Sequence, residues 1–139
     1  MSVNIQTIRR SVAGGRQLAG QILIYIAGLG LLAAAIAKFA HLPPVVAQLT
    51  NAGFGGEKIT LVASLELLSA LLFLLPVTRS IGVPFASAFL GGAIAAHVRA
   101  GEFAGALWPA LFMSVCWMGA WLRYPEVLWS LSHRGQKDR

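Results

Sequence analysis

The stretch "LVASLELLSALLFLLP", residues 61–76, decides the fold class, because it is an almost unbroken apolar run that contains one carboxylate, Glu66. With the residues just before it, the run approaches the ~20 apolar residues with which a helix crosses about 30 Å of hydrocarbon. A charged side chain inside such a helix is costly and should face the interior of a helix bundle. The direction and the partner of Glu66 therefore become the central questions.

Helical periodicity predicts the direction of Glu66. The residues that share its face are mostly small, whereas the opposite face is made of leucines. Small faces pack against other helices and leucine faces meet lipid, so we expect Glu66 to point inward. The Glu66 face comprises Val62, Ala63, Ser69, Ala70 and Phe73, and the opposite face comprises Leu61, Leu65, Leu68, Leu72 and Leu75.

The composition of the whole 139-residue chain is that of a membrane protein: 57% of the residues are hydrophobic, 12% are charged, and the mean hydropathy is +0.71. A small domain leaves much of its surface exposed, so lipid has to cover the apolar side chains that no core of this size can bury. The net charge of +6 forms no basic patch interleaved with aromatic residues, which argues against nucleic acid as a partner. The single cysteine, Cys116, excludes an intrachain disulfide and a CxxC pair.

Four apolar segments are long enough to span a bilayer, at residues 17–40, 58–75, 81–98 and 106–122. Between the first two lies "HLPPVVAQLTNAGFGG", residues 41–56, which combines two prolines and several turn-forming residues with a short amphipathic "VVAQL". The sequence therefore predicts an all-α fold, a four-helix transmembrane bundle that forms a single domain over residues 1–139.

The basic residues predict the orientation of this bundle. With both termini in the cytoplasm, most of the lysines and arginines flank the inner ends of the spans, as the positive-inside rule requires. Trp108 would then lie at the outer interface, and Trp121, Tyr124 and Trp129 at the inner one, where aromatic rings are favoured. The inner residues are Arg9, Arg10, Arg16, Arg79, Arg123, Arg134, Lys137 and Arg139, and the outer ones are Lys38, Lys58 and Arg99.

Two further polar residues, Lys38 and His97, lie near the outer ends of the first and third spans. At 1.5 Å per residue they lie roughly 3 to 6 Å below the outer boundary, and Glu66 lies about 12 Å below it. Side chains lean toward the N-terminus of their own helix, so Lys38 and His97 lean down while Glu66 leans up. We therefore predict a buried polar cluster of Glu66, Lys38 and His97, in which Lys38 is the partner of Glu66.

Structural interpretations of the same residues stay open. Lys38 can snorkel to the outer interface, His97 can bond a backbone carbonyl, and Glu66 can fix the helix register without any chemistry. His97 also lies off the smallest face of its helix, which we expect to pack against another helix. That packing face comprises Ala88, Gly91, Gly92 and Ala95.

The chain offers no recognisable metal or haem site. The histidines and carboxylates nearest the outer surface, His41, His97, Glu57 and Glu102, match no known ligand spacing. Haem ligation in a bundle needs two histidines at one depth on facing helices, and only His97 lies inside a predicted span.

Several sequence motifs of this chain resemble those of the DoxX-like family of small four-helix membrane proteins. The matching segments are "AKF" with Lys38, the connection "HLPPVVAQLTNAG", "LEL" around Glu66 followed by "LLFLLPVTR", and "GGAIAAH" ending in His97. They occur in the order and spacing of the family, from about Ile22 to Trp121.

The resemblance implies a multi-pass protein of the bacterial cytoplasmic membrane. Family members are similar to a small subunit of terminal quinol oxidase and thiosulfate:quinone oxidoreductase systems, and to a membrane partner of redox-stress enzymes. A more distant relative is a chaperone for nicotinic receptor assembly. This chain lacks the paired cysteines that a thiol-redox relative needs, which argues against direct dithiol chemistry.

Two hypotheses on function follow. In the first, the protein is a redox accessory whose outer half holds a quinone-type or other small apolar ligand, with Lys38 or His97 bonding its carbonyl oxygen and Glu66 accepting a proton. In the second, it is a non-catalytic chaperone or assembly subunit, with a structural Glu66 and a partner helix docked on the small-residue face. Expected partners are the lipid bilayer and, beyond it, a membrane or redox protein or further copies of this chain; no catalytic residue is assigned.

Overall fold

The computed structural model describes the backbone of residues 5–124 and the side chains of residues 14–124. Within that range the chain forms five helices and no strand, which confirms the all-α class. Four long helices correspond to the four predicted segments, and α2 contains the amphipathic "VVAQL". The helices are α1 (Ile5–Phe39), α2 (Pro43–Asn51), α3 (Glu57–Leu74), α4 (Arg79–Arg99) and α5 (Phe103–Arg123).

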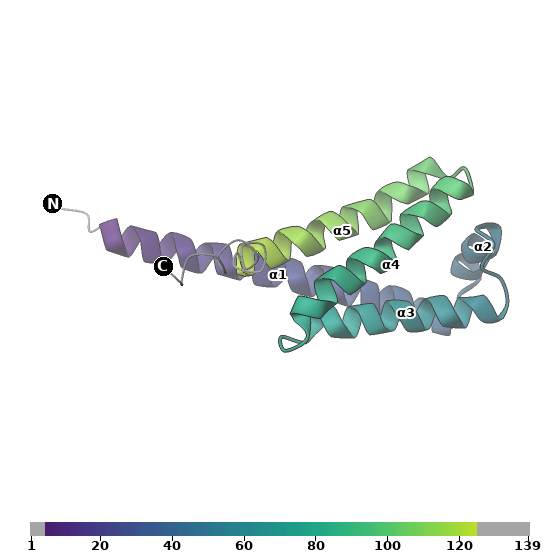
Figure 1. Cartoon of the computed structure of the whole chain (residues 1–139), viewed down its shortest axis with the longest axis horizontal. Helices are drawn as coiled ribbons and strands as arrows, with labels where there is room; N and C mark the ends of the chain where they lie inside the picture. The colour runs from purple at the N-terminus through teal and green to yellow at the C-terminus, as the bar shows by residue number, and fades with distance from the viewer. Residues whose placement is uncertain (1–4, 125–139) are drawn as a thin grey trace, which may run out of the picture.

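The four long helices are arranged in a ring. α1 packs against α3 and α5, and α4 packs against the same two helices (Figure 1). α2 lies across one end, beside the ends of α1 and α4 and the starts of α3 and α5. We call this the α2 end, and we call the opposite end, with the α3–α4 turn and the last residues of α5, the turn end.

The orientation predicted for α3 is confirmed. Glu66 retains 5% of its accessible surface, whereas Leu61 on the opposite face retains 60%. Ser69, next to Glu66 on the inner face, is fully buried and donates its hydroxyl to the carbonyl of Leu65. The inward face of α3 is thus small and polar, and its outward face is leucine-rich.

The core lies where small residues let the helices approach closely. Gly82 of α4 lies against the backbone of Leu72 in α3, where a Cβ atom would collide with the Leu72 carbonyl group. Gly20 of α1 lies in the same way against the backbone of α5 at Gly119 and Arg123. The buried hydrophobic cluster between the helices is Ile24, Ala27, Leu31, Ala70, Phe73, Val83, Ala86, Leu90, Cys116 and Ala120.

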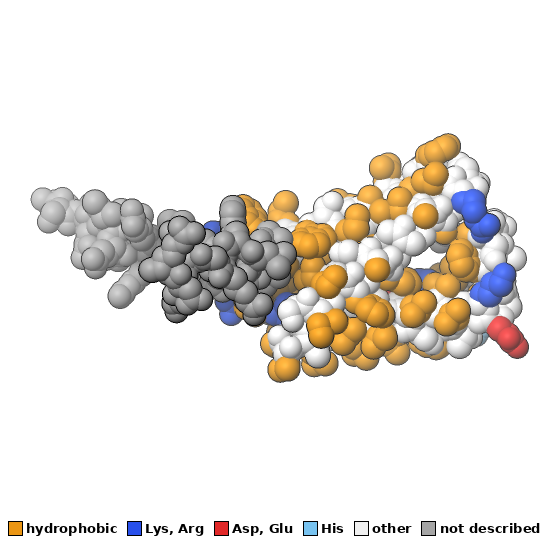
Figure 2. All heavy atoms as spheres, in the orientation of Figure 1, with side chains coloured by type: hydrophobic (Ala, Val, Ile, Leu, Met, Phe, Trp, Pro, Cys, Tyr) orange, Lys and Arg blue, Asp and Glu red, His pale blue; other side chains and the backbone are white. Residues whose placement is uncertain are grey.

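The exterior is that of a membrane protein. Three helical segments are long and apolar enough to cross a bilayer, at Gly14–Phe39, Arg79–Arg99 and Phe103–Arg123. α3 carries Glu57, Lys58 and Glu66 within its 18 residues and is not among these three. Hydrophobic side chains spread along the outside of the long helices, as Figure 2 shows for one face. A soluble monomer rarely exposes so large an apolar surface.

The described basic side chains divide between the two ends. Arg16, Arg79 and Arg123 lie at the turn end among Trp121 and Tyr124. Lys38, Lys58 and Arg99 lie at the α2 end, as their contacts there indicate. The remaining residues used to predict orientation lie outside the side chains that the structure describes: Arg9, Arg10, Trp129, Arg134, Lys137 and Arg139.

Candidate functional site

Lys38 and Glu66 form a buried ion pair between α1 and α3. The Nζ atom of Lys38 donates to Oε2 of Glu66 at 2.6 Å, and their side chains are 14% and 6% exposed. Lys38 lies one residue before the end of α1, so its long side chain reaches back into the bundle along its own helix. The lysine therefore bonds the carboxylate instead of extending to the interface.

Both members of the pair keep unused hydrogen-bonding capacity. Besides Glu66, Lys38 makes one long contact of 3.5 Å to the carbonyl of Ala34, and an ammonium group has three N–H donors. Oε1 of Glu66 accepts no hydrogen bond from any residue in the described range. A third polar group can therefore join the pair without breaking it.

His97 takes a different partner from the one expected. Its Nδ1 lies 3.0 Å from Oε2 of Glu102, in the connection to α5, and its side chain is 16% exposed. The ring packs against Gly105 in the first turn of α5, where a Cβ atom would collide with it. The structure brings Lys38 and Glu66 into contact but bonds His97 to neither of them.

A cleft at the α2 end nevertheless brings all three residues onto one surface. It lies between the five helices and has a volume of ≈ 590 Å³, within the range of small-molecule pockets. Figure 2 shows the molecule hollowed at this end. The polar lining residues are Lys38, Gln48, Glu66 and His97, and the aromatic ones are Phe54, Phe89, Trp108 and Phe112.

α2 closes one side of this cleft through Val45, Gln48 and Leu49. No residue of α2 is buried, but Ala52, immediately after the helix, is 7% exposed. The carbonyl of Ala52 accepts a 2.8 Å hydrogen bond from Nη2 of Arg99, at the end of α4. Arg99 thus ties the α2 segment to the rim of the ring.

The small-residue face of α4 meets no other described helix. A Cβ atom added at Gly91 or at Gly92 would find no neighbour within 4 Å, and Ala88 and Ala95 are exposed. Ala88 and Gly92 border the cleft instead. The close contact of α4 with α3 is made elsewhere, at Gly82. That another helix packs on the small-residue face therefore stays a prediction.

Several residues of the cleft and its rim were not predicted from the sequence. Glu102 and Gly105 lie between the predicted third and fourth spans, yet they contact the His97 ring. Trp108, expected only at the interface, lines the cleft while remaining 69% exposed. The five-residue separation of His97 and Glu102 was the available signal. A tight turn between them can bring the carboxylate back to the imidazole ring.

The side chains described, residues 14–124, contain no cluster of three or more His, Cys, Asp or Glu residues that could hold a metal ion. The polar groups that line the cleft are an ammonium, a carboxylate, an imidazole and an amide, and its other walls are largely aromatic or aliphatic.

Comparisons with known proteins give the family. Neither curated proteins nor solved structures gave a match. The DoxX-like family matches residues 22–119, a range that includes Lys38, Glu66 and His97 and spans most of the chain. The chain belongs to the DoxX-like family.

Proposed function

We propose that this protein is a membrane accessory protein that holds a small apolar molecule with an oxygen-bearing ring, of the quinone type, in the cleft at the α2 end. The observation that carries the proposal is the Lys38–Glu66 pair in the wall of an otherwise apolar, aromatic-lined cleft of ≈ 590 Å³. Ligand sites typically combine such apolar walls with a few convergent polar groups.

The chemistry of the pair suits a carbonyl oxygen attached to the ligand ring. The free N–H of Lys38 would donate to a carbonyl oxygen of the ligand, and Glu66 would take up or release the proton that accompanies a change in ligand redox state. The aromatic side chains of Phe89, Trp108 and Phe112 offer faces and edges on which a planar ring packs. The electrons would come from a redox partner, because no described residue of this chain carries them.

The proposal includes the membrane topology. α3 crosses the bilayer with the other three long helices, its ionised Glu66 compensated by Lys38, and the four spans form a transmembrane bundle. Both termini lie in the cytoplasm of a bacterium, and the cleft opens toward the outer side of the cytoplasmic membrane. The described basic side chains divide equally between the two ends, so the support for this orientation comes from the sequence beyond them. There, Arg9, Arg10, Arg134, Lys137 and Arg139 all flank the predicted inner ends of the spans.

Ligand binding is tested on the full chain purified in mild detergent. Its lipophilic extract should contain a quinone, and a short-chain ubiquinone analogue should raise the thermal stability of the wild-type protein. The same analogue should shift Glu66→Gln much less, because the neutral amide no longer orients Lys38. An extract without quinone, together with equal shifts for both proteins, would exclude the quinone-type ligand.

Two neighbouring glycines provide a matched control. Gly92 borders the cleft and Gly91 does not, while a Cβ atom at either position meets nothing within 4 Å. Gly92→Leu should therefore fill the cleft mouth and weaken binding of the analogue, whereas Gly91→Leu should leave binding unchanged. Equal effects of both variants would argue that the ligand binds elsewhere.

The alternative function is a non-catalytic chaperone or assembly subunit. It is favoured by the uncovered face of Ala88, Gly91, Gly92 and Ala95, which has room for a partner helix or for a second copy of the chain. Here Gly91→Leu should abolish a partner recovered by cross-linking, while Glu66→Gln only lowers stability. Unchanged recovery from Gly91→Leu would argue against this function.

A further inference from the structure

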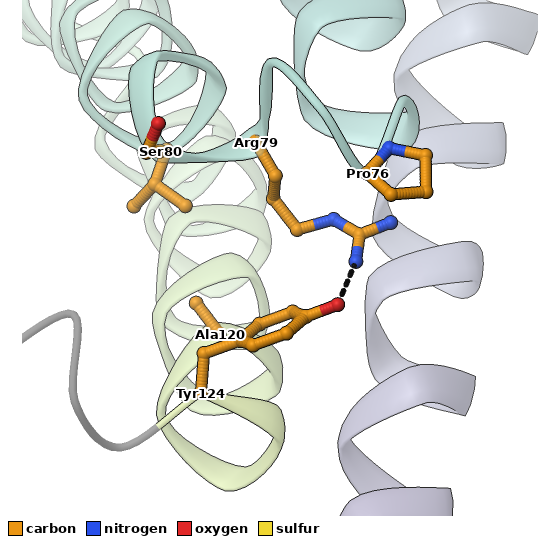
Figure 3. A pocket seen from close by; sticks show the side chains of 6 residues that line it. Pro76, Arg79, Ser80, Ala120 and Tyr124 are labelled. Carbon is orange, nitrogen blue, oxygen red and sulfur yellow. Dashed lines mark hydrogen bonds between the residues drawn. The ribbon is translucent and has the colours of Figure 1, made fainter.

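A second pocket lies at the turn end, around the guanidinium of Arg79. This side chain is 4% exposed and stands at the first position of α4. Nε donates to the carbonyl of Phe73 at 3.1 Å and Nη2 to that of Leu74 at 2.9 Å. Nη1 donates to the hydroxyl of Tyr124 at 3.0 Å, the bond drawn in Figure 3. Arg79 thus caps the last turn of α3 and joins it to the end of α5.

The positive charge of Arg79 has no negative side chain beside it in the described range. Its three hydrogen-bond partners are neutral, and burying a cation without a counter-charge is costly. The end of α3 contributes only about half a negative charge through its helix dipole. Two further arginines lie close by, since Arg123 stacks on the Tyr124 ring at 5.1 Å and Arg16 on the Trp121 ring at 4.8 Å.

The pocket is lined by Arg79 and Tyr124, and both side chains keep hydrogen-bond donors unused within the described range. Arg79 uses three of its five N–H groups, so two remain. The Tyr124 oxygen accepts from Arg79, which leaves the proton of that hydroxyl free to donate. The volume is ≈ 170 Å³, about six times the ~30 Å³ share of one water molecule. The remaining walls, Pro76, Val83 and Ala120, are apolar, and Ser80 turns its hydroxyl away from the guanidinium (Figure 3).

We propose that this pocket binds a phosphate-type anion, with the phosphodiester of an anionic membrane lipid as its principal source. α4 begins at Arg79 and α5 ends at Arg123, so the pocket lies at the boundary of two apolar spans, which is the level of lipid head groups. Basic pockets between helices at the cytoplasmic boundary favour acidic head groups. The apolar walls suit the glycerol and acyl portions of the same lipid. This site is separate from the cleft and independent of its ligand.

The test measures lipid binding to the full chain in mild detergent by native mass spectrometry. Phosphatidylglycerol should bind about tenfold more tightly than phosphatidylcholine, and Tyr124→Phe should lower its affinity about tenfold through loss of one charge-assisted hydrogen bond. Arg79→Lys should also weaken it, because an ammonium lacks the planar fork that bonds two phosphate oxygens. Inorganic phosphate is titrated in parallel. Displacement of the lipid by millimolar phosphate would show that the phosphate-type ligand of this pocket is the free ion and not the lipid head group.

Tyr25→Phe is the matched control, since it removes a hydroxyl from a half-exposed tyrosine of α1 that does not line the pocket. It should leave lipid affinity unchanged. Equal affinities for the two lipids without any binding of phosphate, or equal losses in Tyr124→Phe and Tyr25→Phe, would overturn the proposal. Because the readout is relative affinity, a general loss of stability in Arg79→Lys does not imitate the expected result.

Discussion

At the scale of single residues, the Lys38–Glu66 pair is asymmetric in its energetics. Both groups are removed from solvent, and their mutual attraction must offset the cost of desolvating two charges. Removing one partner leaves the other charge buried and alone, whereas replacing both with apolar side chains removes the attraction and the cost together. A single substitution therefore measures the cost of an uncompensated buried charge, whereas a double substitution measures the net contribution of the pair.

We expect Glu66→Ala to lower the free energy of unfolding by about 3–5 kcal/mol, the usual cost of an uncompensated buried charge. The double variant Lys38→Met/Glu66→Leu should instead stay close to the wild type or exceed it. Chemical unfolding in detergent, followed by far-ultraviolet circular dichroism, measures both. If the double variant loses as much as Glu66→Ala, the pair is holding the bundle together by more than charge compensation.

Glu57→Gln provides the control on the same helix. Glu57 is exposed in the first turn of α3 and interacts chiefly with the helix dipole, so its loss should cost no more than about 1 kcal/mol. A cost as large as that of Glu66→Ala would show that any carboxylate on α3 matters equally.

At the scale of the elements, glycine position decides how closely α3 and α4 approach. A methyl group at Gly82 would collide with the backbone of Leu72, and backbone cannot rotate away as a side chain can. Gly91, nine residues further along α4, has open space around its Cα atom. The same substitution should therefore have opposite effects at the two positions.

Gly82→Ala should destabilise the protein by about 1–3 kcal/mol, because the two helices must separate. Gly91→Ala should be neutral or stabilise it by up to about 1 kcal/mol through the higher helix propensity of alanine. Unfolding of the two variants, measured side by side in one detergent, checks the difference. Equal destabilisation would mean that Gly91 is already covered, for example by a second copy of the chain.

The α2 segment depends on few contacts for its position. Arg99→Gln removes the guanidinium that bonds the carbonyl of Ala52, and a hydrogen bond to a charged group typically contributes about 1.5–3 kcal/mol. Amide hydrogen exchange in residues 43–56 should therefore accelerate about tenfold or more. Arg16→Gln, at the other end of the molecule, should leave that segment unchanged. Equal exchange in both variants would show that Arg99 does not hold α2.

Sequence reasoning succeeded for α3 because the faces of a helix follow from local periodicity. Glu66 lies on the small face of its own helix whatever surrounds it, and the structure buries that face. The partner of His97 depends instead on how the chain turns after α4. Gly101 adopts a positive φ of 75° there, and the tight turn brings the carboxylate of Glu102 to the imidazole.

The size and the lining of the cleft could not be predicted, for a related reason. Its walls come from five helices, and a void between them depends on crossing distances that no single segment encodes. Likewise, small residues indicate that a helix face is suited to close packing but not which face is used. α4 uses Gly82 for this purpose and leaves Gly91 and Gly92 uncovered.

At the scale of the whole molecule, the proposed orientation predicts which positions reagents reach from each side. In a Cys116→Ala background, Thr50→Cys in α2 should react with a membrane-impermeant maleimide added to intact spheroplasts. Ser80→Cys at the turn end should react only after the cells are opened. Both engineered positions are exposed, so burial does not limit either reaction. The reverse pattern would place the termini outside.

The unequal lengths of the helices have a consequence for the surrounding lipid. With α3 crossing as proposed, its 18 residues span about 27 Å, slightly less than the ~30 Å of a typical hydrocarbon layer. The apolar part of α1, 26 residues long, spans about 39 Å. Hydrophobic mismatch of this kind is relieved by tilting the longer helix and thinning the bilayer beside the shorter one. The protein should therefore deform its annular lipid unevenly around its perimeter, with the thinnest bilayer along the leucine face of α3.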